Sequence, residues 1–336
     1  MAKVIVYNLT MSKRHISQKQ RARIENMQKK LSQPEHVLGD HCVHDGLVLT
    51  RFSRHAEIET STGERILCSI RPNLQSLVAG DRVVWREEGT KQGVVLSCYP
   101  RISVLERFTN QGHVKSVAAN ITQIVIVVSV KPTISWLLLD SYLVLAESLD
   151  LSVCIILNKT DLPCQPVKDR LQQEYAVLGY PILYLSKIHQ EGYAALQQQM
   201  TKAVSVFVGQ SGVGKSSLIQ YLLPHQQTIA IAPISSSSDL GCHTTSNSYY
   251  YHIPSGGALI DSPGVREFKL SHLAIPNIIK GFREIQPLVT KCKFRNCDHQ
   301  TSPGCAVIQA VATKEIAHNR YENFLKLCKD LSLRCT

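Results

Sequence analysis

The sequence predicts a multidomain protein: a basic arm, a small β-barrel, a central α/β domain with a mostly parallel sheet, and a helical domain with a Cys/His cluster. Three observations predict this order. Short β-rich runs fill residues 46–97, strongly apolar runs alternate with helical stretches over 121–263, and three cysteines and a histidine lie within fourteen residues near the C-terminus. A chain of 336 residues also fits several ordinary domains better than one.

Composition limits the class of protein. Hydrophobic residues make up 44% and charged residues 19%, which excludes a wholly disordered or fibrous chain. The apolar run 124–128 is too short to cross a membrane, and 4–7 is too short for the core of a secretory signal. We therefore expect a cytoplasmic monomer with no membrane contact. In such a chain the eleven cysteines should be reduced thiols.

The arm is expected over residues 1–40, and it concentrates the positive charge. Lys and Arg outnumber Asp and Glu by 37 to 26, and residues 1–35 hold eight of the basic side chains against two acidic ones. Such an excess favours a polyanionic partner, nucleic acid first. Ile24, Met27 and Leu31 have helical spacing, so the arm is either a segment that becomes helical against a partner or a solvated tail.

Residues 41–108 are expected to form the barrel. The predicted strands are 46–50, 56–60, 65–70, 81–86 and 93–97. Five strands in about sixty residues make the oligonucleotide-binding OB barrel a natural candidate, and an SH3-like or other small barrel fits the pattern equally well.

Residues 109–275 are expected to form the α/β domain. The predicted strands are 121–128, 153–157, 181–185, 204–208 and 258–260. Runs that are apolar on both faces are typical of a parallel sheet covered by helices on both sides.

The run 204–208 leads directly into a phosphate-binding loop. Residues 209–216 read G-x-x-x-x-G-K-S and precede an apolar helix start. In such a loop the backbone N–H groups surround phosphate oxygens, Lys215 reaches the β- and γ-phosphates as a catalytic group, and the Ser216 hydroxyl binds Mg²⁺. The nucleotide contacts expected here are Gly209, Gln210, Ser211, Gly212, Val213, Gly214, Lys215, Ser216 and Ser217.

A second motif identifies the base. Asn158, Lys159 and Asp161 form N-K-x-D at the end of the run 153–157. Guanine presents two adjacent donors that a carboxylate can accept, whereas adenine would leave Asp161 without donors, a mismatch able to reject a ligand by roughly 10⁴. The motif predicts GTP and GDP as ligands; under the alternative of a P-loop ATPase, Asp161 would have no role.

Two further segments, 261–264 and 241–245, are expected to contribute to Mg²⁺ binding and to contact the γ-phosphate. Asp261 and Gly264 form D-x-x-G after the run 258–260, which places a carboxylate near the metal and a backbone N–H near the phosphate. The stretch 241–245 lies between this motif and the phosphate loop, and we expect Thr244 and Thr245 to contribute there, with Thr245 on Mg²⁺.

The order of the motifs is unusual. The base-reading motif begins 51 residues before the phosphate loop. Circular permutation of a domain preserves where its strand ends meet, so the site can still assemble. In the permuted order, the segment that begins at Asp261 also leads directly into the C-terminal domain.

The C-terminal domain, residues 276–336, is expected to be helical around a metal. Cys292, Cys297, His299 and Cys305 form the Cys₃His set that suits one tetrahedral, structural Zn²⁺; the alternative is four reduced residues that are close by chance. Basic residues beside and between the ligands, Lys291, Lys293 and Arg295, suit rRNA phosphates.

With these motifs in order, the sequence resembles the RsgA (YjeQ) family, the circularly permuted, ribosome small-subunit-dependent GTPases of bacteria. The likeness covers nearly the whole chain. It implies GTP hydrolysis with Mg²⁺, stimulated by the small ribosomal subunit during its late maturation, with the barrel and zinc domain contacting rRNA. A different class, an RNA-binding adaptor that holds GTP without turnover, stays open.

The resemblance also suggests individual roles. Leu162, Ser186 and Lys187 would complete the guanine pocket, although the family carries Ser-Ala where this chain has Ser186-Lys187. Val265 stands where Ras-like enzymes carry the glutamine that orients the attacking water. His243 is similar to the residue proposed for that role in the family, so we expect it to be catalytic.

Overall fold

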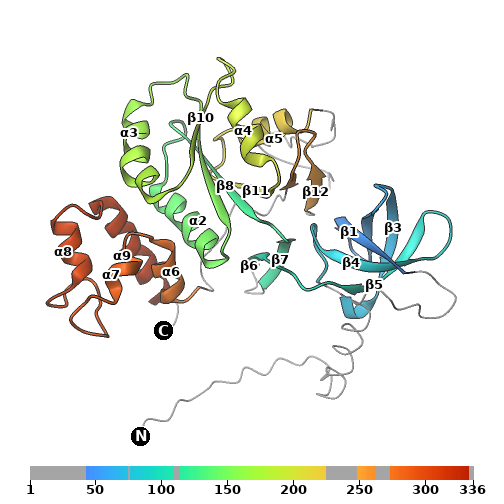
Figure 1. Ribbon diagram of the computed structural model, residues 1–336, viewed down its shortest axis with the longest axis horizontal. Coiled ribbons are helices and arrows are strands. Elements are labelled where there is room, and N and C mark those ends of the chain that lie inside the picture. Colours follow the sequence, from blue (N-terminus) through green and yellow to red (C-terminus); the bar gives the residue numbers. More distant parts are fainter. Residues whose placement is uncertain (1–42, 75, 109–113, 225–247, 262–272, 333–336) are drawn as a thin grey trace, which may run out of the picture.

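The barrel is formed by the first five strands that the structure describes (Figure 1). The structure, a computed structural model, describes residues 43–74, 76–108, 114–224, 248–261 and 273–332, so the basic arm lies outside the described residues. The strands are β1 (Val43–Phe52), β2 (His55–Thr60), β3 (Arg65–Ile70), β4 (Arg82–Glu87) and β5 (Gln92–Cys98), with a short helix η1 (Pro72–Leu74). Strand β1 pairs with both β2 and β4, which closes the barrel as expected.

A hairpin leads from the barrel to the central domain. Strands β6 (Val104–Phe108) and β7 (Val114–Ala119) form a separate two-stranded sheet. The hairpin spans residue 108, where the sequence suggested a domain boundary.

The central sheet has the strand order β10-β9-β8-β11-β13-β12. The strands are β8 (Gln123–Ser129), β9 (Ser152–Asn158), β10 (Ile182–Leu185), β11 (Val204–Val208), β12 (Tyr249–His252) and β13 (Ala258–Asp261). The pairs are parallel except that β12 runs antiparallel to β13. Five of these strands coincide with the five apolar runs of the sequence.

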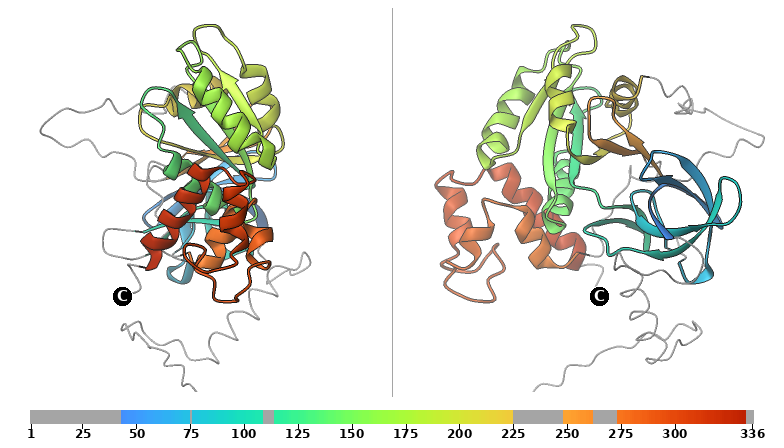
Figure 2. Two further views of the ribbon diagram at one scale, coloured as in Figure 1. Left: turned by 90° about the vertical axis from the view of Figure 1, so that its left-hand side faces the viewer. Right: turned by 45° about the vertical axis from the view of Figure 1, so that its right-hand side comes forward.

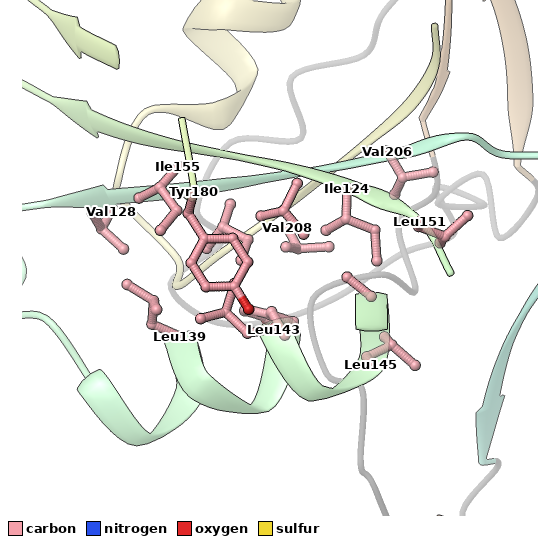
Figure 3. Packing of buried hydrophobic residues seen from close by; sticks show 14 of the residues in the cluster. Ile124, Val128, Leu139, Leu143, Leu145, Leu151, Ile155, Tyr180, Val206 and Val208 are labelled. Atoms are coloured by element: carbon pink, nitrogen blue, oxygen red, sulfur yellow. The ribbon is translucent and has the colours of Figure 1, made fainter. Parts of the chain in front are cut away.

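Helices cover both faces of this sheet, which explains why its strands are apolar throughout. One face packs on α2 (Trp136–Ser148) and α3 (Gln165–Glu174), and the other on α4 (Tyr193–Met200) and α5 (Lys215–Leu222). Alternate residues of β8 enter the two cores: Ile124 and Ile126 face α2, and Val125 and Val127 face α5. Figure 3 shows the α2 side, where Leu139 and Leu143 pack beneath the strands.

The barrel and the central sheet are joined edge to edge. Strand β1 pairs with β12 through Thr50 and Tyr249, so β12 has the barrel on one side and β13 on the other. The C-terminal helices lie on a different side of the central domain, against α2 (Figure 2).

The C-terminal part consists of α6 (Ile275–Gly281), α7 (Gln286–Val289), α8 (Ala306–Ala312) and α9 (His318–Ser332). Phe282 and Phe324 pack edge to face in its core, and Val144 of α2 belongs to the same core. A Cβ at Gly281 would lie 2.5 Å from the Val144 backbone, so glycine permits this close approach.

Acidic residues of α2 and the turn after it hold this domain in place. Glu147 pairs with Arg283 at 2.7 Å and Asp150 with Lys280 at 2.6 Å near the surface. Asp140 is completely buried, where it pairs with Arg320 and accepts a hydrogen bond from Asn323 at 2.6 Å. These contacts join α2 and the turn after it to four residues of the C-terminal domain.

The buried pair is satisfied by further partners. Arg320 also binds Glu284 at 2.8 Å, and Tyr175 donates to Asp140 at 3.0 Å. Burial raises the pKa of the Asp140 carboxyl, against the influence of Arg320, Asn323 and Tyr175. Burial by itself lowers the pKa of Arg320, but the charges of Asp140 and Glu284 outweigh it, and the net shift is upward. Such a cluster favours one specific docking geometry because each group depends on its partners.

None of the helices among the described residues is both long and apolar enough to span a bilayer.

Candidate nucleotide-binding site and metal centre

The phosphate loop connects β11 to α5, as the sequence predicted. Strand β11 ends at Val208, and α5 begins at Lys215 after a loop whose Gly209, Gly212 and Gly214 all have positive φ. The Lys215 Nζ donates to the carbonyls of Gly209 at 2.7 Å and Gln210 at 2.6 Å. The loop therefore closes around its own lysine at the N-terminus of a helix, an arrangement that suits an anion.

Gln210 ties this loop to α2. Its Oε1 accepts from the backbone N–H of Ser135 at 2.9 Å, and its Nε2 donates to the carbonyl of Thr133 at 3.2 Å. Ser135 in turn caps α2 by accepting from the N–H of Leu138. The sequence predicted Gln210 only as a nucleotide contact within the loop, and nothing in its local pattern reveals this side-chain bridge.

The base-reading motif contacts the phosphate loop directly. Asn158 ends β9, and its buried amide donates to the carbonyl of Val213 at 2.9 Å. A Cβ at Gly214 would lie 2.2 Å from Asn158 Nδ2, so the loop requires glycine there. Lys159 Nζ donates to the carbonyl of Gly212 at 2.7 Å. The structure thus brings 158–159 and 212–214 into one site.

Asp161 lies in the turn that follows β9, and a second loop orients it. Its Oδ1 accepts from the Ser186 hydroxyl at 3.1 Å. Ser186 is fully buried at the end of β10 and also accepts from the His189 N–H at 3.2 Å. Leu162 closes the turn by donating to the carbonyl of Lys159, while the Lys187 side chain is exposed. The sequence predicted Ser186 as part of the guanine pocket but gave no sign of its side-chain contact with Asp161.

Asp261 is the last residue of β13, beside the strand that carries the phosphate loop. Ser216 and Ser217 are exposed in the first turn of α5. The loop N–H groups, the two serines and Asp261 are thus at the same edge of the sheet, because parallel strands end together there. Four expected site residues, His243, Thr244, Thr245 and Gly264, lie outside the described residues.

The Cys/His cluster is assembled in the C-terminal part. One ligand atom from each of Cys292, Cys297, His299 and Cys305 lies within 4.8 Å of the others. The Cys292 and Cys305 Sγ atoms are 3.9 Å apart, and they lie 3.6 Å and 3.5 Å from His299 Nδ1. Four ligands about 2.3 Å from a tetrahedral zinc are separated by about 3.8 Å, so this donor set fits Zn²⁺.

The surroundings support metal ligation by a neutral imidazole. Burial lowers the pKa of His299, and the Tyr321 hydroxyl of α9 donates to the His299 carbonyl at 2.6 Å. The cluster therefore connects the loop 292–305 to α9, which also carries Arg320.

Comparison with known proteins gives a consistent result. The family model described as RsgA GTPase matches residues 98–271. The chain is 44% identical over 331 residues to the "Small ribosomal subunit biogenesis GTPase RsgA" of Actinobacillus pleuropneumoniae serotype 5b, covering 94% of this chain and 95% of that protein. It is 42% identical to the protein of the same name from Proteus mirabilis, covering 96% and 97%.

Two solved structures are similar over most of the chain. Superposition on YjeQ from Thermotoga maritima gives a TM-score of 0.70 at 31% identity and covers 86% of this chain and 99% of that one. YloQ, described as a circularly permuted GTPase, gives 0.68 at 27% identity and covers 89% and 98%.

Proposed function

Since the chain belongs to the RsgA GTPase family, we propose that this GTPase acts in the biogenesis of the small ribosomal subunit and that binding to the subunit stimulates its turnover. GTP would bind between the loop 209–216 and the motif 158–161. One observation carries this site: Asn158 and Lys159 donate to the carbonyls of Val213 and Gly212, so one nucleotide can span both motifs.

Guanine specificity would come from Asp161. Its carboxylate accepts the two adjacent donors of guanine, while the Ser186 hydroxyl holds it in place. Leu162 and Lys187 would border the base. Adenine has no such donor pair, so its binding would leave Asp161 unsatisfied.

The phosphates would lie in the loop. Lys215 would exchange the carbonyls of Gly209 and Gln210 for β- and γ-phosphate oxygens. Ser216, Asp261 and Thr245 would hold Mg²⁺, which neutralises charge on the phosphates. Gly264 would donate its N–H to the γ-phosphate, and Thr244 would lie near the nucleotide.

The attacking water needs a group to orient it. We assign this task to His243 because the D-x-x-G motif continues with Val265, whose apolar side chain cannot orient water.

The other domains would bind rRNA. The net charge of +11 favours a polyanion, and Lys291, Lys293 and Arg295 lie beside or between the proposed zinc ligands. The metal would be structural, because four protein ligands leave no open position for chemistry. The protein would act as a cytoplasmic monomer on the assembling subunit.

Multiple-turnover phosphate release tests this proposal. Purified small subunits should raise the rate of the wild-type protein and leave Lys215→Ala near background. Stoichiometric GTP binding without repeated turnover would contradict the enzyme and favour an RNA-binding adaptor.

A further inference from the structure

A row of paired backbone positions runs from the barrel to the proposed Mg²⁺-binding carboxylate. It crosses four neighbouring strands, β2, β1, β12 and β13 (Figure 1). Its members, each opposite the next, are Glu57, Thr50, Tyr249 and Asp261. Strand β12 is therefore the structural link between the barrel and the end of β13.

Side chains reinforce the barrel end of this row. The Tyr249 hydroxyl donates to Glu57 Oε2 at 3.1 Å and accepts from Arg65 Nη1 at 3.2 Å. The Thr50 hydroxyl donates to the carbonyl of Ser248 at 2.9 Å. Burial, followed by the charge of Glu57, raises the pKa of Tyr249 to about 12, so the phenol keeps the proton that it donates.

The other end of the row reaches Asp261. Residues opposite each other in an antiparallel pair project from the same face of the sheet, so Tyr249 and Asp261 share a face. Tyr251 is on this face too, with its ring 4.5 Å from that of Tyr249. Burial and the Asp261 charge raise the pKa of Tyr251, which agrees with a carboxylate nearby.

We propose that Tyr249 is a positioning residue: by anchoring β12 to Glu57 of the barrel, it sets where Asp261 lies relative to the phosphate loop. The inference rests on the proposed function, in which Asp261 belongs to the Mg²⁺ site. Through this anchor, the barrel would affect metal binding by way of β12 and Asp261, without touching the nucleotide itself. A second contact, between His252 and Glu59 at 2.6 Å, holds the far end of β12.

Tyr249→Phe tests the anchor because it removes only the hydroxyl. A small displacement of a metal-binding group can cost up to 10²-fold in rate, so we expect kcat for GTP to fall by about 10-fold. The Mg²⁺ concentration for half-maximal hydrolysis should rise by a similar factor. GDP affinity measured in EDTA should not change, because neither the loop nor the base site is altered.

Matched variants separate positioning from general damage. Glu57→Ala should reproduce the effect, and Glu57→Gln should restore most of the rate because its amide oxygen can still accept from Tyr249. Tyr250→Phe, which removes the adjacent hydroxyl on the opposite face, should behave as wild type. An unchanged Mg²⁺ dependence for Tyr249→Phe, or an equal loss of GDP affinity in EDTA, would overturn the inference.

Asp261→Asn distinguishes this failure from failure of the proposed site. If Asp261→Asn shifts the Mg²⁺ dependence and Tyr249→Phe does not, only the positioning role is wrong. If Asp261→Asn has no effect on the Mg²⁺ dependence, the proposed metal-binding role of Asp261 is wrong, and the inference is wrong with it.

Discussion

The Asn158 amide donates a hydrogen bond to the carbonyl of Val213, a residue 55 positions later, with Nδ2 and O 2.9 Å apart. This bond joins the motif expected to read the base to the loop expected to bind the phosphates. Each element therefore restrains the other, and permutation of the chain order leaves the pair in contact.

Asp161→Asn should change the preferred base. An amide offers both a donor and an acceptor, so it loses one guanine contact and gains one with the carbonyl of xanthine. We expect GTP affinity to fall by about 100-fold or more while affinity for xanthosine triphosphate rises. Competition against a fluorescent GDP analogue measures both values. Ser186→Ala, which removes only the group that orients Asp161, should cost about 5-fold. Equal binding of GTP by wild type and Asp161→Asn would contradict the assignment.

His243→Ala should slow the chemical step and leave binding intact. Loss of a group that orients water costs about 10² in rate. Single-turnover hydrolysis with saturating small subunits measures the step, and GTP affinity serves as the control. A normal rate would remove His243 from the catalytic site.

Metal analysis should find one zinc per chain in the wild-type protein. Cys297→Ser removes one of four ligands and should release the metal, lowering the stability of the C-terminal domain by about 5 kcal/mol or more. Cys328→Ser is the matched control, because this thiol lies in the same domain outside the ligand set. Metal content and thermal unfolding report the two effects; zinc retained by Cys297→Ser would argue against the proposed site.

Arg320→Met should weaken the docking of the C-terminal domain. It leaves Asp140 buried without its cation, and breaking a buried pair costs about 3–5 kcal/mol. Lys280→Met removes the partner of the exposed Asp150 and should cost under about 1 kcal/mol. Urea unfolding followed by fluorescence compares them. Similar losses of unfolding free energy in the two variants would show that burial of the Asp140–Arg320 pair contributes little to stability.

Buried thiols should resist alkylation in the native protein. Burial raises the pKa of Cys154 to about 12, and burial together with Glu88 raises that of Cys68 to about 12. A raised pKa keeps these groups as unreactive thiols at pH 8, and reactivity appears only as the pH approaches 12 or the chain unfolds. Peptide mass spectrometry after iodoacetamide treatment measures this; rapid native labelling of Cys154 would disagree.

The acidic residues of α2 and of the turn after it show where sequence reasoning stops. In the sequence, Asp140, Glu147 and Asp150 only interrupt an apolar stretch and so argue against a membrane helix. The structure pairs them with Arg320, Arg283 and Lys280 of the C-terminal domain. How much each ion pair contributes to stability depends on how deeply it is buried. The spacing of charges along one helix does not show which of them a distant segment of the chain will cover.

The sequence by itself determined five of the six described strands of the central sheet, the loop 209–216 between β11 and α5, the motif 158–161 at the end of β9, and the Cys/His cluster. Each of these depends on residues close together in the chain, where periodicity and spacing follow directly from local geometry. Tertiary structure alone decided that Gln210 bridges to α2 and that Glu57 lies in one row with Asp261. Glu57 is an ordinary polar position of an alternating strand until the barrel closes and its edge pairs with β12. Which edges pair depends on the packing of whole domains, and no local pattern encodes that choice.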